Sequence, residues 1–380
     1  MESHFYDEFG PEYIIEIYDP KLKYKGILVI DNLALGVGKG GIRMTPTVNV
    51  LEVCRLARAM TMKNALFELP FGGAKAGIIL DPRKISPEYK KKAIESFARF
   101  LKPFCPKYYV AGPDINTGEK EMEWFAHAVG SWKAATGKPT SVCIKLFGDK
   151  WERCGIPHEF GSTGFGVAQA TKVAADFLRM DIKKTTCAIA GFGNVGTFAA
   201  KFLIEMGVKI VAVSDAEGAI FDKNGLSNAK LTELKEIGES CVHYHVAKRI
   251  PRDSIYELAV DILIPASVSD VINESNFDKV KTKIIVEGAN IPIREGIEEK
   301  LQKKGILIVP DIVANAGGVI SSFAEYGGQH PKKMFETVQE KITKTAKLIL
   351  EESKKRKISP RVVAEELARK RVREAMSDEG

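Results

Sequence analysis

The chain has 380 residues, of which 45% are hydrophobic and 28% are charged, and its formal net charge is +7. This balance is typical of a folded globular protein and excludes a disordered or collagen-like chain. The length is about two and a half times the ~150 residues of an average domain, so we expect two domains. No apolar run approaches the ~18 residues of a membrane span, and the N-terminus lacks the basic and apolar regions of a signal peptide. We therefore expect a cytoplasmic protein that has no membrane partner.

The cysteines and histidines form no recognisable metal or disulfide pattern. No two of the six cysteines are spaced as CxxC, and the six histidines lack the spacing of metal ligands. The pattern predicts reduced, partly buried thiols and no metal site. The cysteines are Cys54, Cys105, Cys143, Cys154, Cys187 and Cys241.

The first part of the chain mixes short apolar runs with helical periodicity, which predicts an α/β domain over residues 1–150. The expected strands are 27–30, 78–80 and 108–111, and the expected helices are 49–67, 87–102 and 118–135.

The helix expected over 49–67 carries a lysine on its apolar stripe. The stripe consists of Val53, Leu56, Met60, Lys63 and Phe67. Because burying an unpaired ammonium is unfavourable, Lys63 either extends to solvent or faces a cavity that receives an anion. For an isolated lysine we favour the first alternative.

Two further lysines and an aspartate stand in unusual surroundings. Lys39 and Lys75 lie in glycine-dense segments that we expect to be loops, where a ligand can approach the backbone. Asp114 lies in a turn after the strand expected over 108–111, a position where aspartate usually only caps a helix. Crowded lysines lower one another's pKa, so this group of residues is able to perform acid–base chemistry near neutral pH.

The second part of the chain begins after a stretch rich in glycine and proline over 139–163. Five short, continuous apolar runs follow, separated by segments long enough for crossover helices. Such strands, apolar on both faces, predict a doubly wound parallel sheet of the Rossmann type over 163–340. The runs are 186–190, 209–213, 260–264, 283–286 and 307–309.

A dinucleotide-binding motif follows the first of these strands. Its residues Gly191, Phe192, Gly193, Asn194, Val195 and Gly196 read GxGxxG and open a helix expected over 195–206. Asp215 ends the next strand, where an acidic side chain accepts a hydrogen bond from a ribose hydroxyl. The alternative is a glycine turn that binds nothing.

The C-terminal segment is basic, with 14 Lys/Arg against 7 Asp/Glu between Lys332 and Glu374. Nucleic acid could bind such a segment. We favour a solvated helix face, because acids alternate with the bases beside an apolar stripe of Val338, Ile342, Thr345 and Leu348. The sequence does not decide onto which domain the helices over about 345–380 pack, the first domain being one alternative.

Taken together, these motifs resemble the glutamate/leucine/phenylalanine/valine dehydrogenase family over nearly the whole chain. The matching segments are Lys39-Gly-Gly-Ile-Arg43, Met60-Thr-Met-Lys63, Pro70-Phe-Gly-Gly-Ala-Lys75, Gly112-Pro-Asp114, Gly191-Phe-Gly-Asn-Val-Gly196, Gly288-Ala-Asn290 and Asn315-Ala-Gly-Gly-Val319. Residues 143–160 depart from the family, which usually has a shorter glycine-rich segment there, and His158-Glu159-Phe160 is closer to the leucine-type form.

The resemblance implies reversible oxidative deamination of an L-amino acid to a 2-oxo acid and ammonia. Lys63 is then expected to bind the substrate's 1-carboxylate. Lys75, with a lowered pKa, would activate water, and Asp114 would carry the proton of the amino nitrogen. In the glutamate-specific branch, a lysine at the position of Lys39, beside Gly40, and a serine at that of Ser322 bind the side-chain carboxylate. We therefore favour L-glutamate and 2-oxoglutarate with ammonium as substrates.

The resemblance also implies NAD or NADP as the coenzyme and a homo-oligomer, usually a hexamer. Thr163, Asn290 and Asn315 join the GxGxxG residues and Asp215 as expected coenzyme-binding residues. Asp215 favours NAD, although Lys209 or Lys223 could meet the phosphate of NADP. The alternatives left open are a leucine- or valine-type dehydrogenase and an inactive relative that binds nucleic acid through its basic C-terminal face.

Overall fold

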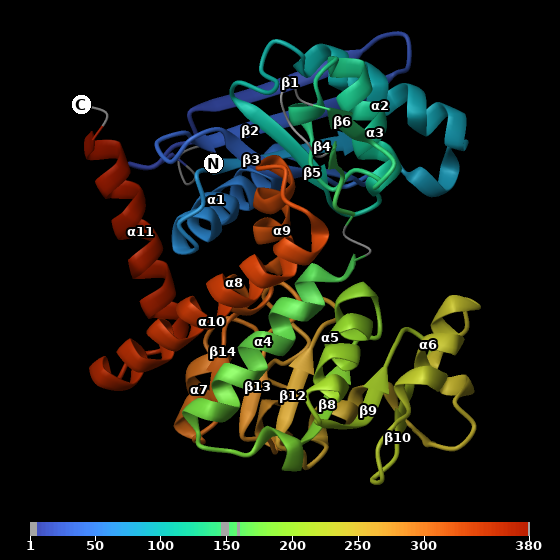
Figure 1. The fold of residues 1–380 in the computed structure, drawn as a ribbon, viewed down its shortest axis with the longest axis vertical. Helices are drawn as coiled ribbons and strands as arrows, with labels where there is room; N and C mark the ends of the chain where they lie inside the picture. The colour runs from blue at the N-terminus through green and yellow to red at the C-terminus, as the bar shows by residue number, and fades with distance from the viewer. Residues whose placement is uncertain (1–5, 146–151, 158–159, 379–380) are drawn as a thin grey trace. The chain divides into compact units, whose positions relative to one another are not determined.

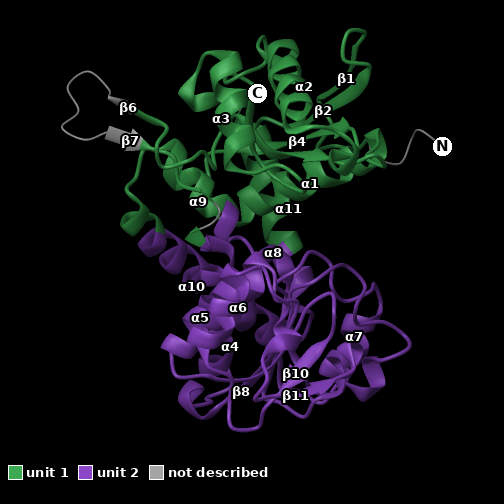
Figure 2. Cartoon of the chain, turned by 90° about the vertical axis from the view of Figure 1, so that its right-hand side faces the viewer, with its two compact units in different colours: residues 1–160, 319–334, 365–380 green, residues 161–318, 335–364 purple. Residues whose placement is uncertain are grey.

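The computed structural model describes residues 6–145, 152–157 and 160–378. The described chain forms two compact units (Figure 2). Residues 1–160, 319–334 and 365–380 make up the first unit, and residues 161–318 and 335–364 make up the second. Part of the N-terminus and of the segment 143–160, including His158 and Glu159, lies outside the described residues. Both units are mixed α/β structures, which confirms the predicted fold class.

A five-stranded sheet with the order β1-β2-β4-β3-β5 forms the centre of the first unit. Its strands are β1 (Tyr13–Asp19), β2 (Tyr24–Asn32), β3 (Gly38–Met44), β4 (Gly72–Ile79) and β5 (Tyr109–Pro113). The first two pairings are antiparallel, whereas β3 pairs in parallel with both β4 and β5. The carboxyl ends of β3, β4 and β5 therefore lie at the same edge of the sheet.

Helices cover both faces of this sheet (Figure 1). Helices α2 (Pro87–Leu101) and α3 (Glu119–Val129) bury Phe97 and Phe125 in one core, and α1 (Val50–Leu66) buries Val53 against Val29 on the other face. The prediction that the third helix continues to residue 135 is wrong. Gly130 ends it with a left-handed φ of 82°, and the 3₁₀ turn Trp132–Ala134 follows.

Lys39 and Lys75 lie inside β3 and β4, so the prediction that both are in loops is wrong. Glycine is ordinarily depleted in strands because it contributes no side chain to packing. Here the missing side chains are a requirement of the sheet: a Cβ on Gly40 would lie 1.6 Å from Ala74 O of the neighbouring strand.

The second unit contains a seven-stranded sheet with the order β11-β10-β9-β8-β12-β13-β14. Its strands are β8 (Thr186–Ala190), β9 (Lys209–Ser214), β10 (Ala219–Phe221), β11 (Lys248–Ile250), β12 (Ile262–Pro265), β13 (Ile284–Val286) and β14 (Leu307–Val309). The five predicted strands are all present and parallel, while β10 and β11 add an antiparallel edge. The chain leaves β8 toward β9 on one side and later returns to β12 on the other, which creates the switch point where doubly wound sheets bind ligands.

Helices α4 (Ser162–Phe177) and α5 (Asn194–Glu205) lie side by side over one face of this sheet (Figure 1). The remaining helices are α6 (Asn228–Glu236), α7 (Ile297–Lys303), α8 (Asp311–Ala314), α9 (Gly317–Tyr326), α10 (Pro331–Arg356) and α11 (Pro360–Asp378). The 3₁₀ turns are Pro82–Lys84, Ile182–Lys184, Cys241–His243, Arg252–Glu257 and Phe277–Lys279.

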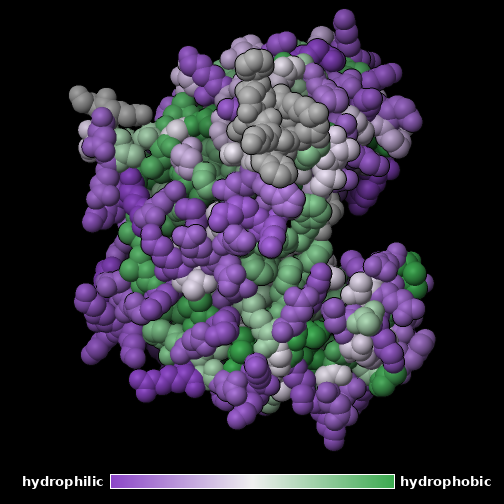
Figure 3. Space-filling view, viewed as in Figure 1, coloured by the Kyte–Doolittle hydropathy of each residue, from purple (hydrophilic) through white to green (hydrophobic). Residues whose placement is uncertain are grey.

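The basic C-terminal segment forms α10 and α11, as its periodicity predicts. Val338 and Ile342 are fully buried, but Leu348 is 37% exposed and Ile349 takes the buried position. The prediction of Leu348 as the last residue of the buried stripe is therefore wrong, because Ile349 has that place. No described helix is long and apolar enough to cross a bilayer, and hydrophilic side chains predominate on the face shown in Figure 3.

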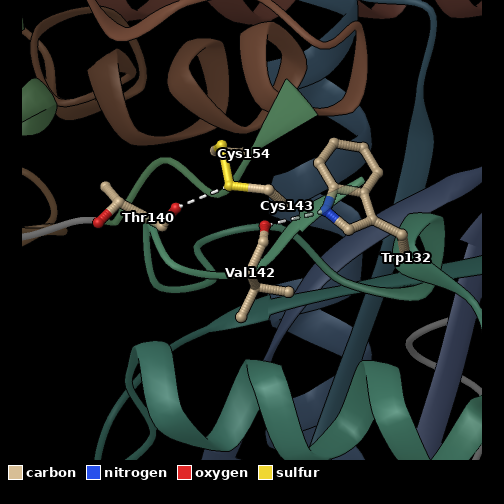
Figure 4. Close-up of a disulfide and its surroundings, with 5 residues drawn as sticks. All are labelled: Trp132, Thr140, Val142, Cys143 and Cys154. Atoms are coloured by element: carbon tan, nitrogen blue, oxygen red, sulfur yellow. Dashed lines mark hydrogen bonds between the residues drawn. A yellow bond between two sulfur atoms is a disulfide. The ribbon is translucent and has the colours of Figure 1, made fainter. Parts of the chain in front are cut away.

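Cys143 and Cys154 form a disulfide, so the prediction that all six cysteines are reduced is wrong (Figure 4). The two residues face each other in a short antiparallel ladder of β6 (Cys143–Lys145) and β7 (Glu152–Cys154), with Trp132 Nε1 donating to Val142 O beside it. Spacing alone cannot predict this pairing, because the ladder that brings the cysteines together has no apolar pattern of its own. The other four cysteines are free and buried.

The disulfide predicts how the thiols react. Iodoacetamide under denaturing, non-reducing conditions should modify the four free cysteines and leave Cys143 and Cys154 unmodified. Prior treatment with dithiothreitol should make all six react, as read by peptide mass spectrometry. A Cys143→Ser variant is the control, and in it Cys154 should react without reduction. Modification of Cys143 in the unreduced wild type would contradict the pairing.

Candidate active site

Three adjacent strands of the first unit bring the sequence-predicted lysines and aspartate together. Lys39 of β3 pairs with Gly73 of β4, and alternate residues along each strand share a face. Lys39 and Lys75 thus point to the face that α1 covers, and Asp114 follows directly after β5 at the same edge. The parallel register explains why residues far apart in the sequence meet at one place.

Two glycines on this face leave the space that the lysine side chains occupy. A Cβ on Gly112 would lie 2.6 Å from Lys39 Nζ, and a Cβ on Gly41 would lie 2.8 Å from Asp114 Cβ and 3.3 Å from Lys75 Nζ. The glycine-dense pattern therefore gives room to ammonium groups that lie across neighbouring strands, whereas the sequence suggested room for a ligand against the backbone.

Asp114 is held by two cations. Its Oδ2 accepts from Lys75 Nζ at 2.9 Å and from Arg43 Nε at 3.0 Å, and Arg43 also binds Glu52 of α1. Burial by itself raises the pKa of Asp114, but the charges of Lys75 and Arg43 outweigh it and lower this pKa to about 2. Asp114 is therefore an ionised carboxylate in direct hydrogen-bond contact with Lys75.

Lys39 is buried, with 3% of its surface exposed, and its Nζ donates to Ala111 O at 3.0 Å. No carboxylate among the described residues lies within 4.0 Å of this ammonium. Burial lowers the pKa of Lys39 to about 7, with the charges of Lys75 and Lys138 adding to the effect and Glu325 opposing it.

Ser322 lies beside the same site, because Thr136 Oγ1 donates to Ser322 Oγ at 3.0 Å. Thr136 Oγ1 and Lys39 Nζ lie 3.8 Å and 2.6 Å from the point where a Cβ of Gly112 would stand. A hydroxyl pair and a buried ammonium therefore approach one location in the first unit.

Sequence reasoning missed the ion pair that supports this location. Lys138 and Glu325 are fully buried, and Lys138 Nζ lies 2.6 Å from Glu325 Oε1. Glu325 Oε2 also accepts from Gly137 N at 2.6 Å and Ile156 N at 3.0 Å. Their sequence signal is weak: two ordinary charged residues, 187 positions apart, in segments without a clear period.

The other two predicted substrate-binding residues are Lys63 and Gly40. Lys63 lies in the last turn of α1 and is partly buried, with Val53 and Phe67 of its stripe buried. Gly40 lies within β3, and its carbonyl accepts from Tyr109 Oη at 3.1 Å.

In the second unit, the GxGxxG residues form the turn between β8 and α5. Gly191 has a left-handed φ of 114°, and a Cβ on Gly196 would lie 1.9 Å from Gly191 O, so both positions require glycine. A Cβ on Gly193 would meet nothing within 4 Å, and no side chain caps α5. An open backbone surface at an uncapped helix N-terminus fits a pyrophosphate, which its amide groups can bind.

A pocket of about 720 Å³ adjoins this turn and is lined by Gly191, Gly193, Asp215, Ala266 and Ser267, among others. Asp215 accepts from Cys241 N at 2.7 Å and Ser240 Oγ at 2.8 Å. Burial raises the pKa of Asp215, but these hydrogen bonds outweigh it and lower the pKa. Asp215 therefore faces the pocket and also binds the start of the 3₁₀ turn Cys241–His243. The sequence did not indicate this second contact.

The remaining predicted coenzyme residues also belong to the second unit. Asn315 Nδ2 donates to Asn290 Oδ1 at 2.9 Å, which joins the segments after β13 and β14. Thr163 is partly buried in the first turn of α4, and a Cβ on Gly317 would lie 3.1 Å from its Cα.

Fold and site together define an oxidoreductase of the amino-acid dehydrogenase class, and comparison with known proteins agrees. The family model for Glutamate/Leucine/Phenylalanine/Valine dehydrogenase matches residues 154–380, and the model for the dimerisation domain of the same family matches residues 13–130. The chain belongs to this family.

Several similar proteins carry the curated name glutamate dehydrogenase. One from Aeropyrum pernix is 40% identical over 305 residues, covering 78% of this chain and 70% of that protein. An NADP-specific enzyme from Saccharolobus shibatae is 39% identical and covers 83% of this chain and 75% of that protein. An NAD-specific enzyme from Staphylococcus aureus is 34% identical and covers 93% and 85%.

Solved structures show the same fold. The hetero-hexameric glutamate dehydrogenase from Thermus thermophilus has a TM-score of 0.87 at 24% identity, over 97% of this chain and 90% of that one. Glutamate dehydrogenase from Peptoniphilus asaccharolyticus has a TM-score of 0.82 at 28% identity, over 97% and 92%.

The buried ammonium of Lys39 predicts a pH dependence of stability. Its folded pKa of about 7 lies below the ordinary 10.5. Between these pH values the unfolded chain binds the additional proton, so the free energy of unfolding rises with pH by roughly 1 kcal/mol per unit. Lys39→Met should remove this slope in urea unfolding measured from pH 7 to 10, whereas exposed Lys92→Met should keep it. Equal slopes in wild type and Lys39→Met would refute the assignment.

Proposed function

We propose that this chain is a glutamate dehydrogenase, which converts L-glutamate reversibly to 2-oxoglutarate and ammonia. The observation that carries the proposal is the buried Lys39 ammonium, which has a carbonyl partner but no carboxylate partner among the described residues. Such a cation is stabilised by an anionic ligand, and a dicarboxylic substrate supplies one. The curated relatives that carry the name glutamate dehydrogenase support the same substrate.

We assign each of the two substrate carboxylates to a lysine, because opposite charges pair. Lys39 and Ser322 bind the side-chain carboxylate, next to Gly40 of the same strand as Lys39. Lys63, partly buried in the last turn of α1, binds the 1-carboxylate. Both carboxylates are then paired with ammonium groups, and the substrate is held in a single orientation.

Lys75 and Asp114 carry the protons. The hydrogen bond of 2.9 Å between Lys75 Nζ and Asp114 Oδ2 provides a direct path for a proton. Lys75 activates water at the 2-carbon, and Asp114 passes the proton to and from the amino nitrogen. Arg43 keeps Asp114 ionised and oriented.

The coenzyme that fits the second unit is NAD or NADP, which supplies the hydride acceptor for the 2-carbon. The amides at the start of α5 bind its phosphates, with Thr163, Asn290 and Asn315 as further contacts. We favour NAD, because the ionised Asp215 on the pocket wall accepts from a free 2′-hydroxyl and repels a 2′-phosphate. Lys209 begins β9, at the opposite end of that strand from Asp215.

We also propose a cytoplasmic homohexamer; the Thermus thermophilus protein of the same fold is a hetero-hexamer, which supports the number of subunits but not their identity. A leucine-type substrate is disfavoured, because an apolar side chain against Lys39 would leave the buried ammonium unpaired. That loss costs a few kcal/mol, or about a hundredfold in discrimination.

Turnover with defined substrates tests the proposal. The protein is mixed with 2-oxoglutarate, ammonium and either NADH or NADPH, and the absorbance of the reduced coenzyme is followed. We expect 2-oxoglutarate to exceed branched-chain 2-oxo acids in kcat/KM by about a hundredfold, with NADH the better coenzyme. Lys39→Leu should abolish glutamate turnover, while exposed Lys92→Leu should not. A preference for branched-chain acids, or no effect of Lys39→Leu, would show the substrate to be wrong.

The proton path predicts a loss of rate without a loss of fold. Asp114→Asn keeps the shape of the side chain and removes a basic oxygen, so kcat should fall by about a hundredfold or more. Lys75→Ala should behave similarly, whereas fluorescence titration should show unchanged binding of the reduced coenzyme. Near-normal kcat in either variant would overturn the assigned roles.

A further inference from the structure

A buried acid lies at the carboxyl edge of the parallel sheet in the second unit and has no part in the catalytic mechanism proposed above. Glu287 follows β13 directly and is fully buried. Its Oε2 accepts from Arg361 Nη2 at 2.5 Å and from Asp311 N at 2.8 Å. Its Oε1 accepts no hydrogen bond among the described residues. A buried carboxylate with only one of its two oxygens hydrogen-bonded destabilises the fold, so its presence calls for an explanation.

One guanidinium serves three acids in this cluster. Arg361 at the start of α11 binds Glu287, Glu298 of α7 at 2.6 Å and Asp311 of α8 at 2.8 Å. Burial raises the pKa of Glu287 to about 8, with Arg361 opposing this shift and Asp311 and Glu298 adding to it. The protonation of Glu287 therefore changes within the ordinary pH range.

Asp311 connects this cluster to the loop that follows β13. Its Oδ2 accepts from Ile291 N at 3.0 Å, and Ile291 has a φ of 48°. A β-branched residue adopts this left-handed conformation only when its surroundings hold it there. Asn315, one turn after Asp311, donates to Asn290 Oδ1 at 2.9 Å.

The same loop adjoins the coenzyme pocket. A Cβ on Gly288 would lie 3.1 Å from Ala266 Cβ, and Ala266 lines the pocket of about 720 Å³. Ser269 Oγ also donates to Asn290 O at 3.0 Å. Movement of residues 288–291 would therefore reach the pocket wall.

We propose that Glu287, Asp311 and Arg361 are positioning residues that hold Asn290 and Asn315 in place for the coenzyme. They touch neither substrate nor coenzyme and act through the loop 288–291 and through α8. The inference rests on the proposed function only for the identity of the coenzyme. Ionised Glu287 attracts Arg361 more strongly than protonated Glu287, so the loop is held more firmly as pH rises through the titration of this group.

Binding of reduced coenzyme, followed by its fluorescence, tests the inference without turnover. Glu287→Gln removes the charge and keeps the size, so Kd for NADH should rise about tenfold at pH 9 and approach the wild-type value at pH 6.5. In steady-state kinetics KM for the coenzyme should rise and KM for 2-oxoglutarate should not. Arg361→Lys, a milder change, should weaken binding in the same direction.

Asp261→Asn is the matched control, because Asp261 is a structural acid of the same sheet, paired with Lys283 and bonded to Thr186 N. It should leave coenzyme affinity and its pH dependence unchanged. Equal Kd values for wild type and Glu287→Gln across the pH range would overturn the inference, as would an equal effect of Asp261→Asn. If Glu287→Gln does not fold, unchanged coenzyme affinity in Arg361→Lys would overturn it. Wild-type protein that binds NADH but does not reduce 2-oxoglutarate would refute the function alone.

Discussion

Burial of the Lys39 ammonium is the constraint on which the first unit depends. The side chain is nearly inaccessible, and among the described residues its Nζ binds a backbone carbonyl and has no carboxylate within 4.0 Å. This placement is possible because Gly112 on the neighbouring strand leaves space for the side chain, and because hydroxyl groups of Thr136 and Ser322 lie nearby. The proposed carboxylate ligand would add, in direct contact, the neutralising charge that Glu325 supplies only from a distance.

In the second unit, the main electrostatic features are an anion-binding turn and a cluster of buried acids. Its proposed coenzyme is an anion, for which the uncapped start of α5 offers backbone amides, and Lys235, Arg252 and Lys279 line the adjoining pocket. A cluster of acids lies farther along the sheet edge, where Arg361 binds three of them. The acid that binds the loop after β13, Asp311, is thus paired with a guanidinium from a segment distant in sequence.

Much of this arrangement could be predicted from the sequence, because the decisive patterns are local. The five parallel strands and the turn at Gly191 follow from apolar runs and glycine spacing. The strand positions of Lys39 and Lys75 could not, since glycine normally indicates a loop and only the close approach of a neighbouring strand explains it here. The pair Lys138–Glu325 was missed for a related reason: such partners are joined by tertiary packing across 187 residues.

The order in which the chain visits its two units has a consequence for biosynthesis. The first unit is assembled from three separate stretches, and the second from two. Glu325, which binds the backbone on both sides of the disulfide hairpin, leaves the ribosome long after that hairpin has been made. Neither unit can be completed before the last part of the chain is synthesised, so no contiguous fragment corresponds to either one, and the unfinished first unit must persist through most of translation.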